Sequence, residues 1–296
     1  MTANIVQTIT PVTHDLGQFE VRRVLPGKAR QMVGPFIFVD QFGPGQLDIG
    51  NGMDVRPHPH INLATVTWLF EGAIDHRDTL GTFSTIRPGT VNLMTAGRGI
   101  AHSERSPEAE RAAGPSLYGM QTWLALPDGR EEIDPAFDAV RDLPIVEDSG
   151  ARACVIMGAL WGERAAKTTH AETIYAEIAL KPGGAVPLEA GAEERAVMLV
   201  GGEAQIDGVS LELHELAVLA PGQAMTLTSR EGGRVMLLGG EAFASERHVW
   251  WNFVSSDPAR IEQAKDDWRA GRFGTVPGDA EEFIPLPDRP KTVSYP

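Results

Sequence analysis

The chain has 296 residues, of which 42% are hydrophobic and 22% charged, which is typical of a globular protein with about two domains. Its 40 acidic residues outnumber 26 Lys and Arg, and the formal net charge of −14 repels phosphate backbones and anionic membranes. Direct nucleic-acid binding and membrane association are therefore not expected. The sequence contains no secretion-type leader and no apolar run of about eighteen residues, so we expect a cytoplasmic protein.

Short β-forming runs separated by turn residues fill the N-terminal half of the chain. Residues 19–24 and 35–41 are rich in β-branched and aromatic types, and Pro26-Gly27 and Gly43-Pro44-Gly45 follow them. Residues 63–70 place apolar side chains on both faces, as in a strand that is covered on both sides. These patterns predict strands joined by turns.

Two short pairs of ligand-type residues stand on predicted strands, namely His58-Pro59-His60 and His102-Ser103-Glu104. Side chains at i and i+2 of a strand share a face, so each pair directs two groups into one interior. A lone His-x-His is commonly solvated, but the second pair has the same spacing and follows the Pro88-Gly89 turn, which favours strands that fold back on one another. The two pairs therefore predict a metal site inside a barrel.

These residue types suit a reactive metal centre. Neutral imidazole binds iron, nickel, copper or zinc, and one carboxylate adds charge without closing the coordination sphere. Three histidines and one glutamate on a six-coordinate ion leave two positions open.

Other polar residues near the predicted ligands have two interpretations each. His76 and Asp78, before Gly81, either contact the ligands from behind or form a turn-stabilising surface pair, and the surface pair is favoured. Arg56 and Arg98 either attract an anionic substrate or pair with acidic residues.

The segment 133–142 is interpreted as a linker, which divides the chain into domains 1–140 and 141–296. The second domain repeats the strand-and-turn pattern, but residues 186–189 (VPLE) stand where a His-x-His would be expected, so we expect no metal site there. Cys154 lies in an apolar run, and a single thiol forms no internal disulfide, so core packing is its expected role. Predicted strands of this half are 174–180, 196–199, 203–206, 215–219 and 234–238.

A helix is predicted near the C-terminus. Asp257-Pro258 gives a cap and a first-turn signal, and Gly271 marks the end. Ile261, Ala264 and Trp268 share one stripe, which predicts a packing helix. The Pro-rich tail from Thr275 is expected to drape over a barrel or to be partly disordered.

Several of these stretches resemble a known family. The pattern Gly52-x5-His58-x-His60, followed by Pro88-Gly89 and His102, resembles the two cupin motifs. The wider text is similar to pirin over most of the chain, notably at residues 22–26 (RRVLP), 33–40 (VGPFIFVD), 94–100 (MTAGRGI) and 102–104 (HSE).

The resemblance implies an all-β bicupin: two tandem cupin β-barrels of the jelly-roll type with a short C-terminal helix. It implies a metal site in the N-terminal barrel with the ligands His58, His60, His102 and Glu104. An ordinary cupin places its glutamate four or five residues after the second histidine, but Ala64 and Thr65 stand there, so Glu104 is the available carboxylate.

The implied activity is that of a metal-dependent dioxygenase of the quercetin 2,3-dioxygenase type, acting on a small aromatic hydroxylated substrate and dioxygen. Fe(II) is the favoured ion, with zinc, nickel, manganese and copper as alternatives, and Glu104 is the candidate catalytic base. The alternative implied by nuclear pirins is an iron-dependent redox sensor that binds a regulatory protein. We expect a monomer.

One departure from the family concerns the segment after His60. Pirins commonly have Arg-Gly-Phe-Glu there, whereas this chain has Ile61-Asn62-Leu63-Ala64. We therefore expect a less charged wall and rim beside the metal and a shifted substrate preference.

Overall fold

The computed structural model describes residues 4–15, 20–167, 169–288 and 292–295. Its described residues form 27 strands and two helices, which confirms the predicted all-β class. Contacts between Cα atoms divide the chain into unit 1, residues 1–13, 22–39 and 142–243, and unit 2, residues 14–21, 40–141 and 244–296. Contact-based units are not independently folding domains, so the boundary at residue 140 stays a prediction.

The predicted metal ligands and a smaller sheet lie in unit 2, and a larger sheet has most of its residues there. The smaller sheet is antiparallel and has the spatial order β5 (Asp54–His60), β10 (Ile100–Arg105), β7 (Ile74–Asp78) and β8 (Phe83–Ile86). The larger has the order β12 (Ala136–Val140), β9 (Val91–Thr95), β6 (Leu63–Glu71), β11 (Ser116–Ala125), β4 (Phe36–Gln46), β3 (Glu20–Leu25) and β2 (Val12–Asp15).

The strands predicted at 19–24, 35–41 and 63–70 are present as β3, β4 and β6, although residue 19 lies outside the described part. The prediction of a linker at 133–142 was wrong for its centre, because β12 pairs with β9 along all five of its residues. The short, half-polar run Ala-Phe-Asp-Ala-Val has weak strand propensity of its own and gains its backbone partners only from β9.

Unit 1 has a sheet with the order β1 (Ile5–Ile9), β22 (Leu216–Leu219), β19 (Glu194–Gly202), β24 (Gly233–Gly240), β17 (Thr173–Leu180), β14 (Ala151–Met157) and β13 (Ile145–Glu147). A second sheet contains β18 (Ala185–Leu188), β23 (Met225–Thr228), β20 (Gln205–Ile206) and β21 (Val209–Ser210), and a hairpin joins β15 (Ala159–Leu160) to β16 (Glu163–Arg164). The inner faces of these sheets supply a core of Ile, Val, Leu and Ala side chains, as in a β-sandwich.

Cys154 lies on β14 in unit 1 and is 5% exposed. Burial raises the pKa of its thiol to about 11, so the reactive thiolate is scarce at neutral pH. The expected role in core packing is confirmed.

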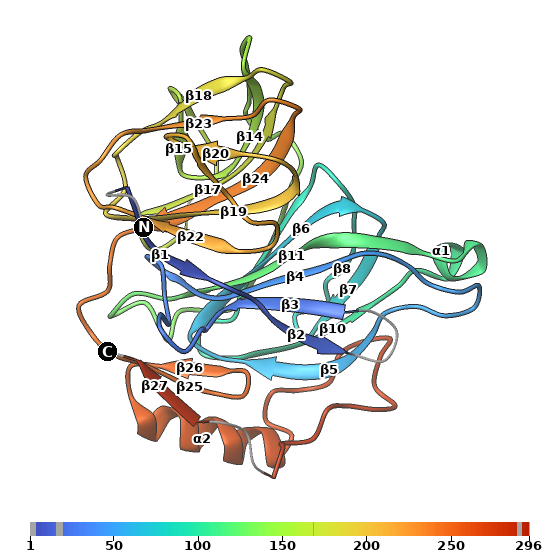
Figure 1. Ribbon diagram of the computed structural model, residues 1–296. Helices are drawn as coiled ribbons and strands as arrows, with labels where there is room; N and C mark the ends of the chain where they lie inside the picture. The colour runs from blue at the N-terminus through green and yellow to red at the C-terminus, as the bar shows by residue number, and fades with distance from the viewer. Residues whose placement is uncertain (1–3, 16–19, 168, 289–291, 296) are drawn as a thin grey trace. The chain divides into compact units, whose positions relative to one another are not determined.

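The two helices lie in unit 2. The first, α1 (Glu108–Ala113), follows β10, and the second, α2 (Pro258–Arg269), packs beside β26 (Phe253–Ser255) of the sheet formed with β25 (Arg247–Trp250) and β27 (Thr292–Tyr295) (Figure 1). The Asp257 side chain accepts the backbone N–H of Ala259, and Ile261, Ala264 and Trp268 are buried, as predicted. Neither helix is long and apolar enough to cross a membrane among the described residues.

The tail after α2 lies against the smaller sheet of unit 2. The Trp268 indole N–H donates to the carbonyl of Ile284 at 3.0 Å, and the N–H of Ile284 donates to the carbonyl of Pro57 at 2.8 Å. The Arg105 guanidinium binds Asp279 at 2.6 Å. The expectation of a draped tail is confirmed for residues up to 288.

Candidate metal centre

The pairing of β5 with β10 brings the histidines to one place. His102 lies directly opposite His58, and Ile100 lies opposite His60. The register shifts on the other side of this pair, where Glu104 faces Val55. Because opposite residues on one face of an antiparallel pair are close neighbours, His58, His60 and His102 share one patch of the sheet.

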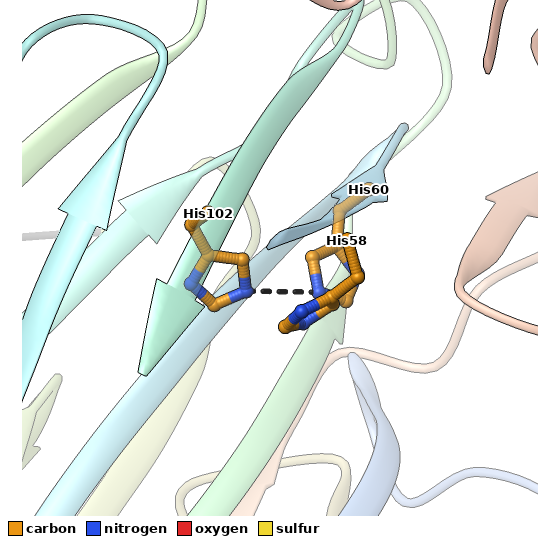
Figure 2. A group of neighbouring side chains, drawn as sticks. All are labelled: His58, His60 and His102. Atoms are coloured by element: carbon orange, nitrogen blue, oxygen red, sulfur yellow. Dashed lines mark hydrogen bonds between the residues drawn. The ribbon is translucent and has the colours of Figure 1, made fainter. Parts of the chain in front are cut away.

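The three imidazoles converge, as Figure 2 shows, with His58 and His60 on β5 and His102 on β10. One ring nitrogen from each lies within 4.8 Å of the others, and the Nε2 atoms of His60 and His102 are 3.1 Å apart. All three side chains are buried. Among the described residues, no second group of three or more potential ligands comes together.

The other ring nitrogens of two histidines are hydrogen-bonded to backbone carbonyls. Nδ1 of His58 lies 2.9 Å from the carbonyl oxygen of Arg56, and Nδ1 of His60 lies 3.2 Å from that of Asn252. A carbonyl only accepts, so each Nδ1 carries the proton and each Nε2 presents a lone pair. This is how proteins orient histidines that bind a metal.

Burial also keeps these histidines neutral. It lowers the pKa of His58 to about 4 and is the main cause that lowers the pKa values of His60 and His102 well below their usual range. The neighbouring imidazoles act in the same direction for His60 and His102. Only the neutral ring can bind a metal, so the unprotonated site is ready at neutral pH.

The donor set fits a divalent ion. Two cis nitrogens on a six-coordinate ion, with bonds of about 2.1 Å at right angles, lie about 3.0 Å apart. The separation of 3.1 Å between Nε2 of His60 and Nε2 of His102 is close to that value.

Glu104 follows on β10, opposite His76, and is also buried. Its carboxylate lies outside the set formed by the three histidines. Burial raises the pKa of this carboxyl, while His76 and a hydrogen bond with the Thr67 side chain act in the opposite direction. Its assignment as fourth ligand and as base stays a proposal.

His76 and Asp78 are placed differently from the favoured expectation. They are only 2% and 0% exposed, so the prediction of a surface pair was wrong, because β10 and β12 cover this part of β7. Asp78 does stabilise the turn, since its Oδ1 accepts the N–H of Leu80 at 2.9 Å. The burial of His76 and Asp78 could have been predicted from strand periodicity. Both residues share a face of the strand with Ile74, an apolar residue that is expected to be buried.

The segment after His60 is part of the core. Ile61 and Leu63 are fully buried. The less charged wall and rim and the shifted substrate preference expected from this segment stay predictions. The Asn62 amide donates to the carbonyl of Glu131 at 2.8 Å, and its backbone has φ 56°. Asparagine tolerates this left-handed conformation better than most residues, so it can stand where pirins commonly have glycine.

The two arginines near the site form ion pairs with acidic residues, which was the alternative to attracting an anionic substrate. Arg56 lies 3.9 Å from Glu282, and Arg98 forms an ion pair with Asp134.

A β-sandwich barrel in which a His-x-His strand and a third histidine meet inside defines a cupin metal centre. Comparison with known sequences gives the family: residues 18–124 match Pirin, and residues 175–274 match the Pirin C-terminal cupin domain. The chain belongs to the pirin family, and its two-cupin fold is confirmed.

Similar proteins cover almost the whole chain. A pirin-like protein of Caulobacter vibrioides is 47% identical over 93% of this chain and 96% of its own. A Pseudomonas aeruginosa protein, provisionally named a quercetin 2,3-dioxygenase, is 37% identical over 92% of this chain and 87% of its own. The crystal structure of a quercetin 2,3-dioxygenase from Acinetobacter baumannii is 33% identical with a TM-score of 0.89, covering 97% of this chain and 98% of that one.

Proposed function

We propose that this chain is a metal-dependent dioxygenase of the quercetin 2,3-dioxygenase type, with one divalent ion held by His58, His60, His102 and Glu104. The observation that carries the proposal is the convergence of three buried neutral imidazoles, two of them with Nδ1 bound to a carbonyl. The activity named for the similar Acinetobacter baumannii protein supports the reaction class. Fe(II) is the favoured ion, and zinc, nickel, manganese and copper suit the same donors.

When bound, such an ion would supply Lewis-acid chemistry, and iron, copper, nickel or manganese would add one-electron chemistry that zinc lacks. The chain's own residues do the rest. The backbone carbonyls of Arg56 and Asn252 hold two histidines in the ligating tautomer. Glu104, whose pKa burial raises, is suited to take the proton of an aromatic hydroxyl that comes within about 3 Å of its oxygen.

Oxygen uptake tests the proposal. We expect iron-loaded protein to consume dioxygen in the presence of quercetin and to place both atoms of ¹⁸O₂ in the products. His60→Ala, treated with the same iron, should not do so, because it lacks the ligand held by Asn252. A wild-type protein that holds iron but consumes no dioxygen with flavonols or smaller phenols would contradict the enzyme and favour the redox or ligand sensor.

A further inference from the structure

His102 differs from the other two histidines in the hydrogen-bond partner of its Nδ1 atom. Its Nδ1 lies 3.4 Å from Nδ1 of a fourth buried imidazole, His76, rather than beside a carbonyl. An imidazole can donate or accept, so His76 does not by itself fix the proton of His102.

Asp78 determines which ring acts as donor in the hydrogen bond between His76 and His102. Its Oδ2 lies 3.0 Å from Nε2 of His76, and a carboxylate only accepts. Nε2 of His76 therefore carries a proton, and Nδ1 of a neutral His76 is left as an acceptor. That acceptor takes the proton of Nδ1 of His102, which leaves Nε2 of His102 as a lone pair directed at His60.

We propose that His76 and Asp78 are positioning residues that fix the tautomer and ring orientation of His102 for metal binding. The inference rests on the proposed metal site and concerns residues that do not touch the ion. It gives all three histidines a fixed acceptor behind the ring: two carbonyls and one His-Asp pair.

The surroundings hold this pair rigidly. Oδ1 of Asp78 accepts the N–H groups of Leu80 and Thr82 at 2.9 and 3.0 Å, which aims Oδ2 at His76. The His76 ring stacks on Phe137 with centroids 4.5 Å apart and an interplanar angle of 25°. Asp78 also lies directly opposite His102 in the pairing of β7 with β10.

Three substitutions separate the donor and acceptor roles of the His76 and Asp78 hydrogen bonds from the packing of the His76 ring. Asp78→Asn keeps the shape and the acceptor for the turn, but its amide donor faces Nε2 of His76 and favours the wrong proton arrangement. His76→Phe keeps an aromatic ring beside Phe137 and removes both hydrogen bonds. His76→Gln restores one acceptor and one donor. Asp75→Asn is the matched control, because Asp75 is on the same strand and bonds to Thr85 instead.

The readout is the affinity for Zn(II), measured by competition with a chelator on full-length protein of unchanged circular dichroism. Asp78→Asn and His76→Phe should bind Zn(II) about 10- to 100-fold more weakly, as for other residues behind metal ligands. His76→Gln should recover most of this loss, and Asp75→Asn should bind as the wild type does. In Zn(II)-loaded wild type, ¹⁵N NMR of labelled histidines should show His76 protonated at Nε2 and not at Nδ1.

The outcomes distinguish this inference from the metal site itself. If wild-type protein binds no Zn(II), Fe(II) or other divalent ion, the proposed metal site and the positioning role of His76 and Asp78 are both wrong. If wild type binds Zn(II) and His58→Ala does not, the metal site stands, and unchanged affinity in Asp78→Asn and His76→Phe would overturn the inference alone. A folded His76→Gln that binds as weakly as His76→Phe, or Zn(II)-loaded His76 protonated at Nδ1, would overturn it as well.

Discussion

Replacing Glu104 by glutamine should lower turnover by ~10² to 10⁴, the usual contribution of a general base. The variant keeps the size and an oxygen of the side chain but cannot take a proton. The carboxylate it replaces is buried, and burial raises its pKa, so it would hold a proton more strongly than an exposed glutamate does. Three histidines remain, so Glu104→Gln should retain part of its metal.

Turnover per bound metal decides between the two roles of Glu104. Full recovery of this quantity in Glu104→Gln, once excess iron is supplied, would remove the role as base. Unchanged metal affinity would remove the role as ligand. Glu108→Gln, on the exposed side of α1, is the control and should change neither quantity.

Replacing Arg247 by methionine should destabilise the protein by about 3 kcal/mol, at the lower end for breaking a buried charged contact. The Arg247 side chain is fully buried and donates to the carbonyl of Leu126 at 2.9 Å and to Asp128 at 2.8 Å. Methionine leaves that carbonyl without its donor and Glu131 without its neighbouring charge, 3.7 Å away. We place the effect at the lower end because Asp128 is 62% exposed and remains hydrated.

Urea denaturation followed by tryptophan fluorescence measures this loss. Arg234→Met is the matched control: Arg234 pairs with Glu177 at 3.1 Å but is 40% exposed, so its loss should cost less than about 1 kcal/mol. Equal stability of the two variants would contradict the role given to Arg247. Arg247→Met should also weaken metal binding, because β25 leads into the turn whose Asn252 carbonyl holds His60.

The sequence predicts the histidine cluster because strand periodicity is a local property. Spacing alone places His58 and His60 on one face of a strand, and His102 on a second strand after a turn. The convergence of these three side chains in the structure agrees with that prediction.

The supports of the cluster could not be predicted in this way, since they depend on packing between distant segments. Asn252 lies 192 residues after His60, and nothing in the sequence around it indicates that its carbonyl meets an imidazole. His76 and Asp78 are polar and precede a turn, which favours the surface unless the covering by β10 and β12 is known. The strand β12 itself was missed because its backbone partner, β9, lies about forty residues earlier.

The metal content of purified protein tests the central claim most directly. We predict one equivalent of divalent metal per chain in the wild type, measured by plasma mass spectrometry after incubation with Fe(II) and gel filtration, and a loss of most of it in His58→Ala. The reason is that one buried histidine cluster is present among the described residues and that His58 is one of its three members. Two equivalents per chain, or metal that persists in His58→Ala, would contradict it.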